Sequence, residues 1–346
     1  MFYIHDTICI SPQTSYADID LGKINRPVEN KLLAKEPSYE GIPLGILRRM
    51  GRAVRMGVGA ALQITKQNLD GIIIGTSNGG MEDCIKFLNQ IIEYEEGMLT
   101  PTNFVQSTTN AIAGQIGLMT QNKGYNCTHV HRGLAFENAI IDADMLLTEN
   151  SSAKYLLGAV DEISAYNYNI DLLDGWFKKE KLTDENLYEL NSAGSIAGEG
   201  TAMFLASKEK VGASAALKAI HILHSEDDQL VANEMKEFIT RYTSHEKIDL
   251  FLSGENGDNR LQKYYSACET VLPEKRAIAR FKHLLGEHPS ATALAVWLAC
   301  QIIKKQSVPS HLLKYPAKNM GINEIMIYNN HKGIQHSFIL ISGVDG

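Results

Sequence analysis

The sequence has few cysteines, no surplus of positive charge and no long apolar run. Its five cysteines are scattered, odd in number and without the spacing of metal ligands, a pattern typical of reduced thiols in a cytoplasmic protein. The formal net charge of −7 gives no indication of general nucleic-acid or membrane-surface binding. The cysteines are Cys9, Cys84, Cys127, Cys268 and Cys300.

Signals for a membrane location are lacking as well. The first residues include Asp6 and no basic segment, so they do not predict a signal peptide. The longest apolar run, residues 291–303, is too short and too interrupted to predict a membrane span. We therefore expect a cytoplasmic protein that has no nucleic-acid or membrane partner.

The composition is that of a globular protein with a substantial core. The chain has 346 residues, of which 44% are hydrophobic and 21% are charged. Strand patterns, as at residues 71–75 and 154–160, alternate with helix patterns, as at residues 229–240 and 291–304. This alternation predicts an α/β protein with buried sheets. A polar segment that contains glycine, residues 208–213, is the best candidate for an internal boundary.

Three arginines lie along one line of a helix predicted at residues 46–61. They are Arg48, Arg52 and Arg55, at helical spacing. Such a row can form a cationic docking face, or its members can be solvated or take part in internal ion pairs. We favour the second interpretation, because solvated or paired arginines are the commoner case.

We expect neither a metal nor a nucleotide cofactor. The glycine-rich turn at residues 75–80 follows a buried strand, as phosphate-binding loops do. It lacks both the Lys-Ser/Thr of a P-loop and the GxGxxG order, so we interpret it as a tight packing turn.

The most informative stretch is residues 121–147. Its pattern predicts a turn, a strand at residues 125–130 and a closely packed helix that begins near Arg132. A strand that breaks into a buried helix is a favourable place for a nucleophile. The free N–H groups at the helix N-terminus lower the pKa of a thiol and can hold an oxyanion. In this sequence His131 occupies that point.

The order of motifs resembles that of the β-ketoacyl-acyl-carrier-protein synthase family along nearly the whole chain. The glycine-rich turn, the proline-containing segment at residues 100–114 and the turn Gly198-Glu199-Gly200 follow one another as in that family. The resemblance implies an α/β, thiolase-like fold with two similar α/β halves in α-β-α-β-α layers. The halves would be residues 1–207 and 208–346, joined in one compact unit.

The family's condensation chemistry requires a cysteine thiolate, and this sequence lacks it at the expected position. The family motif Tyr-x-x-x-Thr-Ala-Cys, counted from Tyr125, places His131 where the cysteine belongs. Cys127 lies four residues earlier, inside the predicted strand, so we do not expect it to reach the helix N-terminus. The thiolate that takes the acyl chain from a carrier protein is therefore missing.

Both catalytic histidines of the family are replaced as well. Ser253 stands at the first position, and Glu287 stands at the second, in a motif whose Lys282 and Gly286 fit the family pattern. His288 is one place further along and would match the catalytic histidine only if both of these anchors slipped. We expect His131, Ser253 and Glu287 to face one cavity.

Loss of these groups resembles the chain-length-factor-like partners of ketosynthases, in particular those of aryl-polyene and flexirubin-type pigment clusters. The resemblance implies a condensation-inactive subunit that pairs with an active synthase, works with an acyl carrier protein and helps to shape the acyl tunnel. Two alternatives stay open. One is an enzyme for hydrolysis or acyl transfer in which Glu287 positions His131 as a base. The other is a structural homodimer.

The resemblance also implies where a partner subunit binds. In this fold the segment before the nucleophile strand lies at the dimer seam, so residues 100–119 are expected to bury their apolar face there. The residues expected nearest the partner's tunnel are Val105, Thr108, Thr109 and Ile112. Alternatively, the small residues of this segment pack inside their own subunit.

Overall fold

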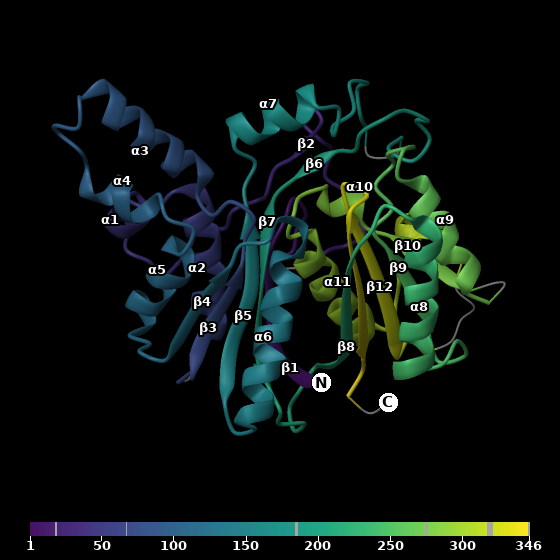
Figure 1. The fold of residues 1–346 in the computed structure, drawn as a ribbon. Coiled ribbons are helices and arrows are strands. Elements are labelled where there is room, and N and C mark those ends of the chain that lie inside the picture. Colours follow the sequence, from purple (N-terminus) through teal and green to yellow (C-terminus); the bar gives the residue numbers. More distant parts are fainter. Residues whose placement is uncertain (18, 67, 184–185, 274–275, 317–320, 345–346) are drawn as a thin grey trace.

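The computed structural model describes residues 1–17, 19–66, 68–183, 186–273, 276–316 and 321–344 (Figure 1). The N-terminal half contains β1 (Phe2–Ile10), β2 (Lys31–Leu32), α1 (Leu44–Leu47), α2 (Arg52–Ile64), β3 (Gly71–Gly75), α3 (Met81–Glu93), α4 (Pro101–Gln106), α5 (Ala111–Thr120), β4 (Tyr125–His129), the 3₁₀ helix η1 (Arg132–Leu134), α6 (Ala135–Glu149), β5 (Lys154–Asp161), α7 (Ala165–Leu173), β6 (Ala197–Gly198) and β7 (Gly200–Ser207). The C-terminal half contains β8 (Ala215–His224), α8 (Asp228–Tyr242), β9 (Leu250–Ser253), α9 (Gln262–Val271), β10 (Ala277–Arg280), α10 (Lys282–Leu285), α11 (Ala291–Lys305), the 3₁₀ helix η2 (Ser310–Leu312), β11 (Leu313–Tyr315), β12 (Glu324–His331) and β13 (Gln335–Ser342).

The main sheet repeats one topology twice. Its strand order is β11-β10-β9-β12-β13-β8-β1-β7-β5-β3-β4, so the order β1-β7-β5-β3-β4 of the first half returns as β8-β13-β12-β9-β10. Strand directions repeat too: β7 and β13 are antiparallel to both neighbours, and β3 and β9 are parallel to theirs. The prediction of two similar α/β halves is therefore confirmed, whereas the division into units at residues 207/208 stays a prediction.

The helices form three layers that alternate with the two halves of the sheet. Helices α6 and α11 lie between the halves, and their buried side chains form one core with strands from both. Helices α2 and α5 cover the outer face of the first half, and α8 and α9 cover that of the second (Figure 1). The result is the α-β-α-β-α layering that the resemblance implies.

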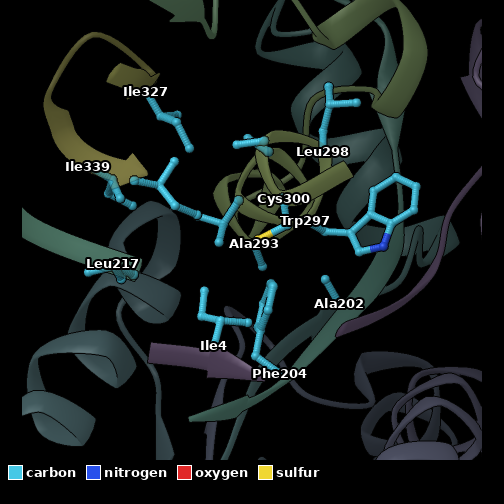
Figure 2. Packing of buried hydrophobic residues seen from close by; sticks show 14 of the residues in the cluster. Ile4, Ala202, Phe204, Leu217, Ala293, Trp297, Leu298, Cys300, Ile327 and Ile339 are labelled. Atoms are coloured by element: carbon cyan, nitrogen blue, oxygen red, sulfur yellow. The ribbon is translucent and has the colours of Figure 1, made fainter. Parts of the chain in front are cut away.

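Helix α11 accounts for the longest apolar run of the sequence. All its residues from Ala291 to Ile303 are buried, because sheet surrounds it on two sides and α6 packs alongside. Figure 2 shows Trp297 and Cys300 of this helix among side chains from β1, β7, β12 and β13. A helix that is apolar all round is typical of a protein interior as well as of a membrane. Among the described residues, no helix is both long and apolar enough to cross a bilayer.

The predicted helix at residues 46–61 is interrupted near its start. Helix α1 ends at Leu47, and α2 begins only at Arg52, with Gly51 as its N-cap. A side chain at Gly51 would collide with the carboxylate of Asp83 on α3 unless that carboxylate moved, so the two segments lie close together here. This contact spans more than thirty residues, and helical periodicity does not reveal it.

Two of the three arginines, Arg52 and Arg55, lie on α2 and form ion pairs within the protein. Arg55 donates to both carboxylate oxygens of Glu36, at 2.6 and 2.8 Å, and Arg52 lies 2.5 Å from the buried carboxylate of Glu199. The interpretation as internal ion pairs is confirmed for these two arginines. Arg48 is exposed on the short turn between α1 and α2.

The prediction that Ile112 faces a partner subunit is corrected by the structure. It lies on α5 with no exposed surface, in the core between α5, α2 and the sheet, where its methyl group meets Gly57. The absence of a side chain at Gly57 draws the two helices together and buries Ile112 in its own subunit. Val105, Thr108 and Thr109 are exposed, as the prediction requires of a surface.

Candidate functional site

A cavity of about 820 Å³ opens where the two halves meet, at the end of the sheet from which α6 and α11 start. Its walls come from the loop before η1, the loop after β5, helix α7, the segment before α11 and the hairpin between β12 and β13. Among the residues proposed from the sequence, His131, Glu287 and His288 line it, whereas Ser253 and Lys282 do not.

His131 lies at the predicted point, immediately before η1, which leads into α6. Its ring meets the ring of His224 edge to face, with 5.6 Å between the centroids. Gln335 of β13, in the C-terminal half, also contacts the segment after His131. Its side-chain oxygen accepts a hydrogen bond from the backbone N–H of Gly133 at 2.9 Å. Contacts from the C-terminal half therefore fix the segment that begins at His131.

Glu287 is held by two partners. One carboxylate oxygen accepts from Nζ of Lys282 at 2.9 Å, and the other accepts from the amide of Asn256 at 2.9 Å. Lys282 is completely buried, so this is an ion pair inside the protein. Within the described residues, no hydrogen bond joins Glu287 to His131. The pair that an acid–base site would need is therefore not formed.

Ser253 does not face the cavity, and this part of the expectation is wrong. It is fully buried at the end of β9, and its hydroxyl accepts from the backbone N–H of Glu255 at 3.2 Å. The loop after β9 is shorter than the family motif and turns back at this point. Asn256, three residues later, reaches the cavity instead and binds Glu287.

Two further histidines, which the sequence did not single out as site residues, complete the wall. His331 of β12 packs against Gly133, where a side chain would collide with its ring, and His224 ends β8. His288 lies beside them, with Nδ1 3.3 Å from the hydroxyl of Ser290 and Nε2 without a partner among the described residues. Chain topology alone brings these residues together, so spacing in the sequence gave no signal for His224.

The buried histidines carry no charge at neutral pH. Burial lowers the pKa of His288 to about 3, with further contributions from Lys282 and His331. Burial likewise lowers the pKa of His331 to about 3, assisted by the cations Lys332 and Lys282. Neutral imidazoles can accept or donate hydrogen bonds, but a base with so low a pKa is weak at pH 7.

The carboxylate of Asp161 holds together two of the loops around the cavity. Asp161, at the end of β5, accepts from the hydroxyl of Thr76 and from the backbone N–H groups of Ser77 and Ser290, at 2.9–3.1 Å. It therefore joins the glycine-rich turn after β3 to the N-terminus of α11. Burial raises the pKa of Asp161. The turn is a packing element that acts through this carboxylate, in line with its interpretation from the sequence.

Comparisons with known proteins agree with this geometry. A sequence model of the family described as "Beta-ketoacyl synthase, N-terminal domain" matches residues 26–174. The resemblance to the β-ketoacyl synthase family is confirmed. The matched β-ketoacyl synthase segment runs from before β2 through the nucleophile position to the end of α7. No curated protein matches the sequence.

Solved ketosynthase structures share the fold over the whole chain. A β-ketoacyl synthase from Burkholderia phymatum STM815 is 15% identical, with a TM-score of 0.80 and 99% of each chain covered. The ishigamide ketosynthase/chain length factor is 13% identical, with a TM-score of 0.79 and coverage of 99% of this chain and 98% of that one. A third match comes from the complex of the ketosynthase ApeO with its chain length factor ApeC, from Xenorhabdus doucetiae. It is 13% identical, with a TM-score of 0.78 and coverage of 99% of this chain and 98% of that one.

Proposed function

We propose that the protein is a condensation-inactive ketosynthase-like subunit of the chain-length-factor type. It pairs with an active β-ketoacyl synthase and works with an acyl carrier protein in a type II, discrete-subunit pathway. The product class that the motifs favour is a fatty-acid- or polyketide-like chain of the aryl-polyene or flexirubin kind. In this proposal the partner supplies the chemistry.

The observation that carries the proposal is the residue at the start of η1. A ketosynthase needs a thiolate there, and this chain has an imidazole. Cys127, the nearest cysteine in the sequence, lies on β4 beside Ile73 of β3 and does not line the cavity. Movement of a side chain cannot bring it to the helix N-terminus, because it is fixed in the ladder of hydrogen bonds four residues earlier.

The geometry supports loss of condensation more than a substitute chemistry. An acid–base site would need Glu287 against His131, but both oxygens of Glu287 are bound to Lys282 and Asn256. Two other imidazoles at the wall, those of His288 and His331, have pKa values of about 3. A cavity of this kind can still hold or exclude part of an acyl chain by its shape.

The pairing also has support from the surface of the N-terminal half. Helix α4 has no buried residue, and β4 ends the strand order of the sheet, so both are available to a second subunit. The solved structures that share this fold include a ketosynthase in complex with its chain length factor. The exposed apolar residues of this region include Leu88, Ile92, Met98, Phe104, Val105 and Leu118.

Co-expression with an intact ketosynthase and carrier protein from the same gene neighbourhood tests the proposal. Native mass measurement should find a one-to-one heterodimer, and the mixture should elongate acyl chains whereas this chain alone should not. Replacing the nucleophilic cysteine of the partner by alanine should abolish elongation. The variant His131→Ala of this chain should retain most of it.

Two results would contradict the proposal. One is an acyl adduct on a cysteine of this chain that disappears when that cysteine becomes alanine. The other is elongation, or hydrolysis of acyl-carrier protein, that survives in the partner's Cys→Ala variant and is lost in His131→Ala. The second result would favour the alternative enzyme with a non-cysteine site. A stable homodimer that does not bind the synthase would favour the structural role.

A further inference from the structure

We propose that Cys127, His129 and Asp142 form a binding site for one divalent transition metal ion, with zinc as the preferred ion. The three donor atoms lie within 4.8 Å of one another. The first two residues are on β4, two apart and therefore on one face of the strand, and the third is on α6. None of them lines the cavity, so the site is separate from the one described above.

The spacing of the donors suits tetrahedral coordination. Sγ of Cys127 lies 3.7 Å from Nε2 of His129, which lies 2.9 Å from a carboxylate oxygen of Asp142. Zinc binds sulfur at about 2.3 Å and nitrogen or oxygen at about 2.0–2.1 Å, so the tetrahedral edges are about 3.5 and 3.3 Å. The observed separations differ from these edges by a few tenths of an ångström, which small side-chain rotations can supply.

Charge and donor type favour zinc. A thiolate and a carboxylate together balance the ion's two positive charges. No lysine or arginine in the described part of the chain forms a salt bridge with Asp142. A sulfur, nitrogen and oxygen donor set suits zinc and other borderline ions, whereas calcium and magnesium prefer oxygen ligands. The side chains of His129 and Asp142 are 26% and 17% exposed, so water can reach the fourth position.

Binding requires a defined movement of protons. Without metal, Nε2 of His129 lies at hydrogen-bonding distance from Asp142. With metal, Nε2 gives its lone pair to the ion, the imidazole proton resides on Nδ1, and Cys127 binds as a thiolate. The thiol proton of Cys127 is released to solvent when the ion binds.

Tyr125 completes the site from the second layer. Its hydroxyl donates to the coordinating oxygen of Asp142 at 3.0 Å and thereby fixes the orientation of the carboxylate. Removal of such outer-layer partners typically weakens metal binding by about 10- to 100-fold. Tyr125 is also the first residue of β4, so it shares the rigid strand with two of the ligands.

The ion would clamp the last strand of the sheet to the helix that follows it. Strand β4 pairs with β3 and stands at the end of the strand order, so within the described part of the chain one of its edges has no strand beside it. Helix α6 begins after His131 and carries Asp142 two turns on. The metal would therefore close a loop of residues 127–142 and hold His131 in place from outside the cavity.

The metal-free, reduced full chain can be titrated with Co²⁺ as a spectroscopic probe and with Zn²⁺ in competition. We expect one ion per chain, with a thiolate-to-cobalt charge-transfer band in the near ultraviolet. The variants Cys127→Ser and Asp142→Asn should lose at least about ten-fold in affinity, and the first should also lose the band. Cys84→Ser is the matched control, because Cys84 is half-buried too but lies on α3, away from the site.

Zinc should raise the thermal unfolding temperature of the wild type and of Cys84→Ser, and not that of Cys127→Ser. Tyr125→Phe should keep the band and bind more weakly. Circular dichroism of each metal-free variant checks that it folds. The proposal is overturned if saturable binding is absent, or if the band and affinity persist in Cys127→Ser, which would place the ion among other ligands.

Discussion

The ion pair of Lys282 with Glu287 shows how single residues fix the wall of the cavity. Lys282 has no exposed surface, and Glu287 is its counter-ion at the position of a family histidine. A lysine from the family motif and a non-family glutamate thus form one structural unit.

Breaking this pair should destabilise the protein strongly. Lys282→Met leaves a carboxylate near the cavity without its cation, and removal of one partner of a buried pair costs about 3–5 kcal/mol. Urea unfolding should show this loss for Lys282→Met, and the double variant Lys282→Met/Glu287→Leu should recover most of it. Equal midpoints for Lys282→Met and the wild type would show that the two side chains are not paired in solution.

Glu137 makes stability depend on pH. It is fully buried on α6 beside the hydroxyl of Ser337, and burial raises its pKa from 4.5 to about 7. Between these values the unfolded chain is ionised while the folded one keeps its proton, so stability falls as pH rises from about 4.5 to 7. Above pH 7 the loss is complete, and below 4.5 it is absent.

The variant Glu137→Gln should remove this dependence. Its stability relative to the wild type should be similar or lower at pH 4.5, should improve up to about pH 7 and should then stay constant up to pH 8. Thermal unfolding at four pH values in that range measures the difference. A difference that stays constant across the range would mean that Glu137 keeps its ordinary pKa in the folded protein.

At the scale of the elements, α11 is the part on which the core depends most. It is buried on all sides, and Trp297 fills space between the two halves of the sheet. Trp297→Ala should lower the free energy of unfolding by about 3–5 kcal/mol. The control Leu173→Ala, at a residue of α7 that is 88% exposed, should change it by less than about 0.5 kcal/mol. Similar losses in both variants would contradict this assignment of the core.

The elements also show what the sequence can and cannot predict. Periodicity located α11, because burial on every side leaves an unmistakable apolar run, and it located the strand before His131. It failed at Gly51, where α2 begins and the chain lies against Asp83 of another helix. The family motif failed for Ser253, because the direction of a side chain at the end of β9 depends on tertiary contacts. The order of motifs predicted the fold. That His131, His224 and His331 line one cavity was seen only in the structure.

At the scale of the molecule, the surface that carries α4 should mediate pairing. Val105 is 57% exposed there, and burial of apolar surface at the centre of an interface supports stable association. Val105→Glu should weaken heterodimer formation at least ten-fold in native mass titrations without lowering the unfolding temperature. Val211→Glu, in the loop after β7, is the matched control. Equal binding by both variants would show that α4 lies outside the interface.

The loop between Ser207 and Ala215 has a consequence for how the protein can be assembled. It links two strand sets of equal topology, and beyond it the sheet halves meet through a short pairing of Phe2–Ile4 with residues 215–217 and through the core around α6 and α11. A chain cut in this loop should behave as a split protein. Each fragment alone would expose one side of the shared core and aggregate. Expressed together, they should reassemble into a soluble pair that co-purifies through a tag on one fragment.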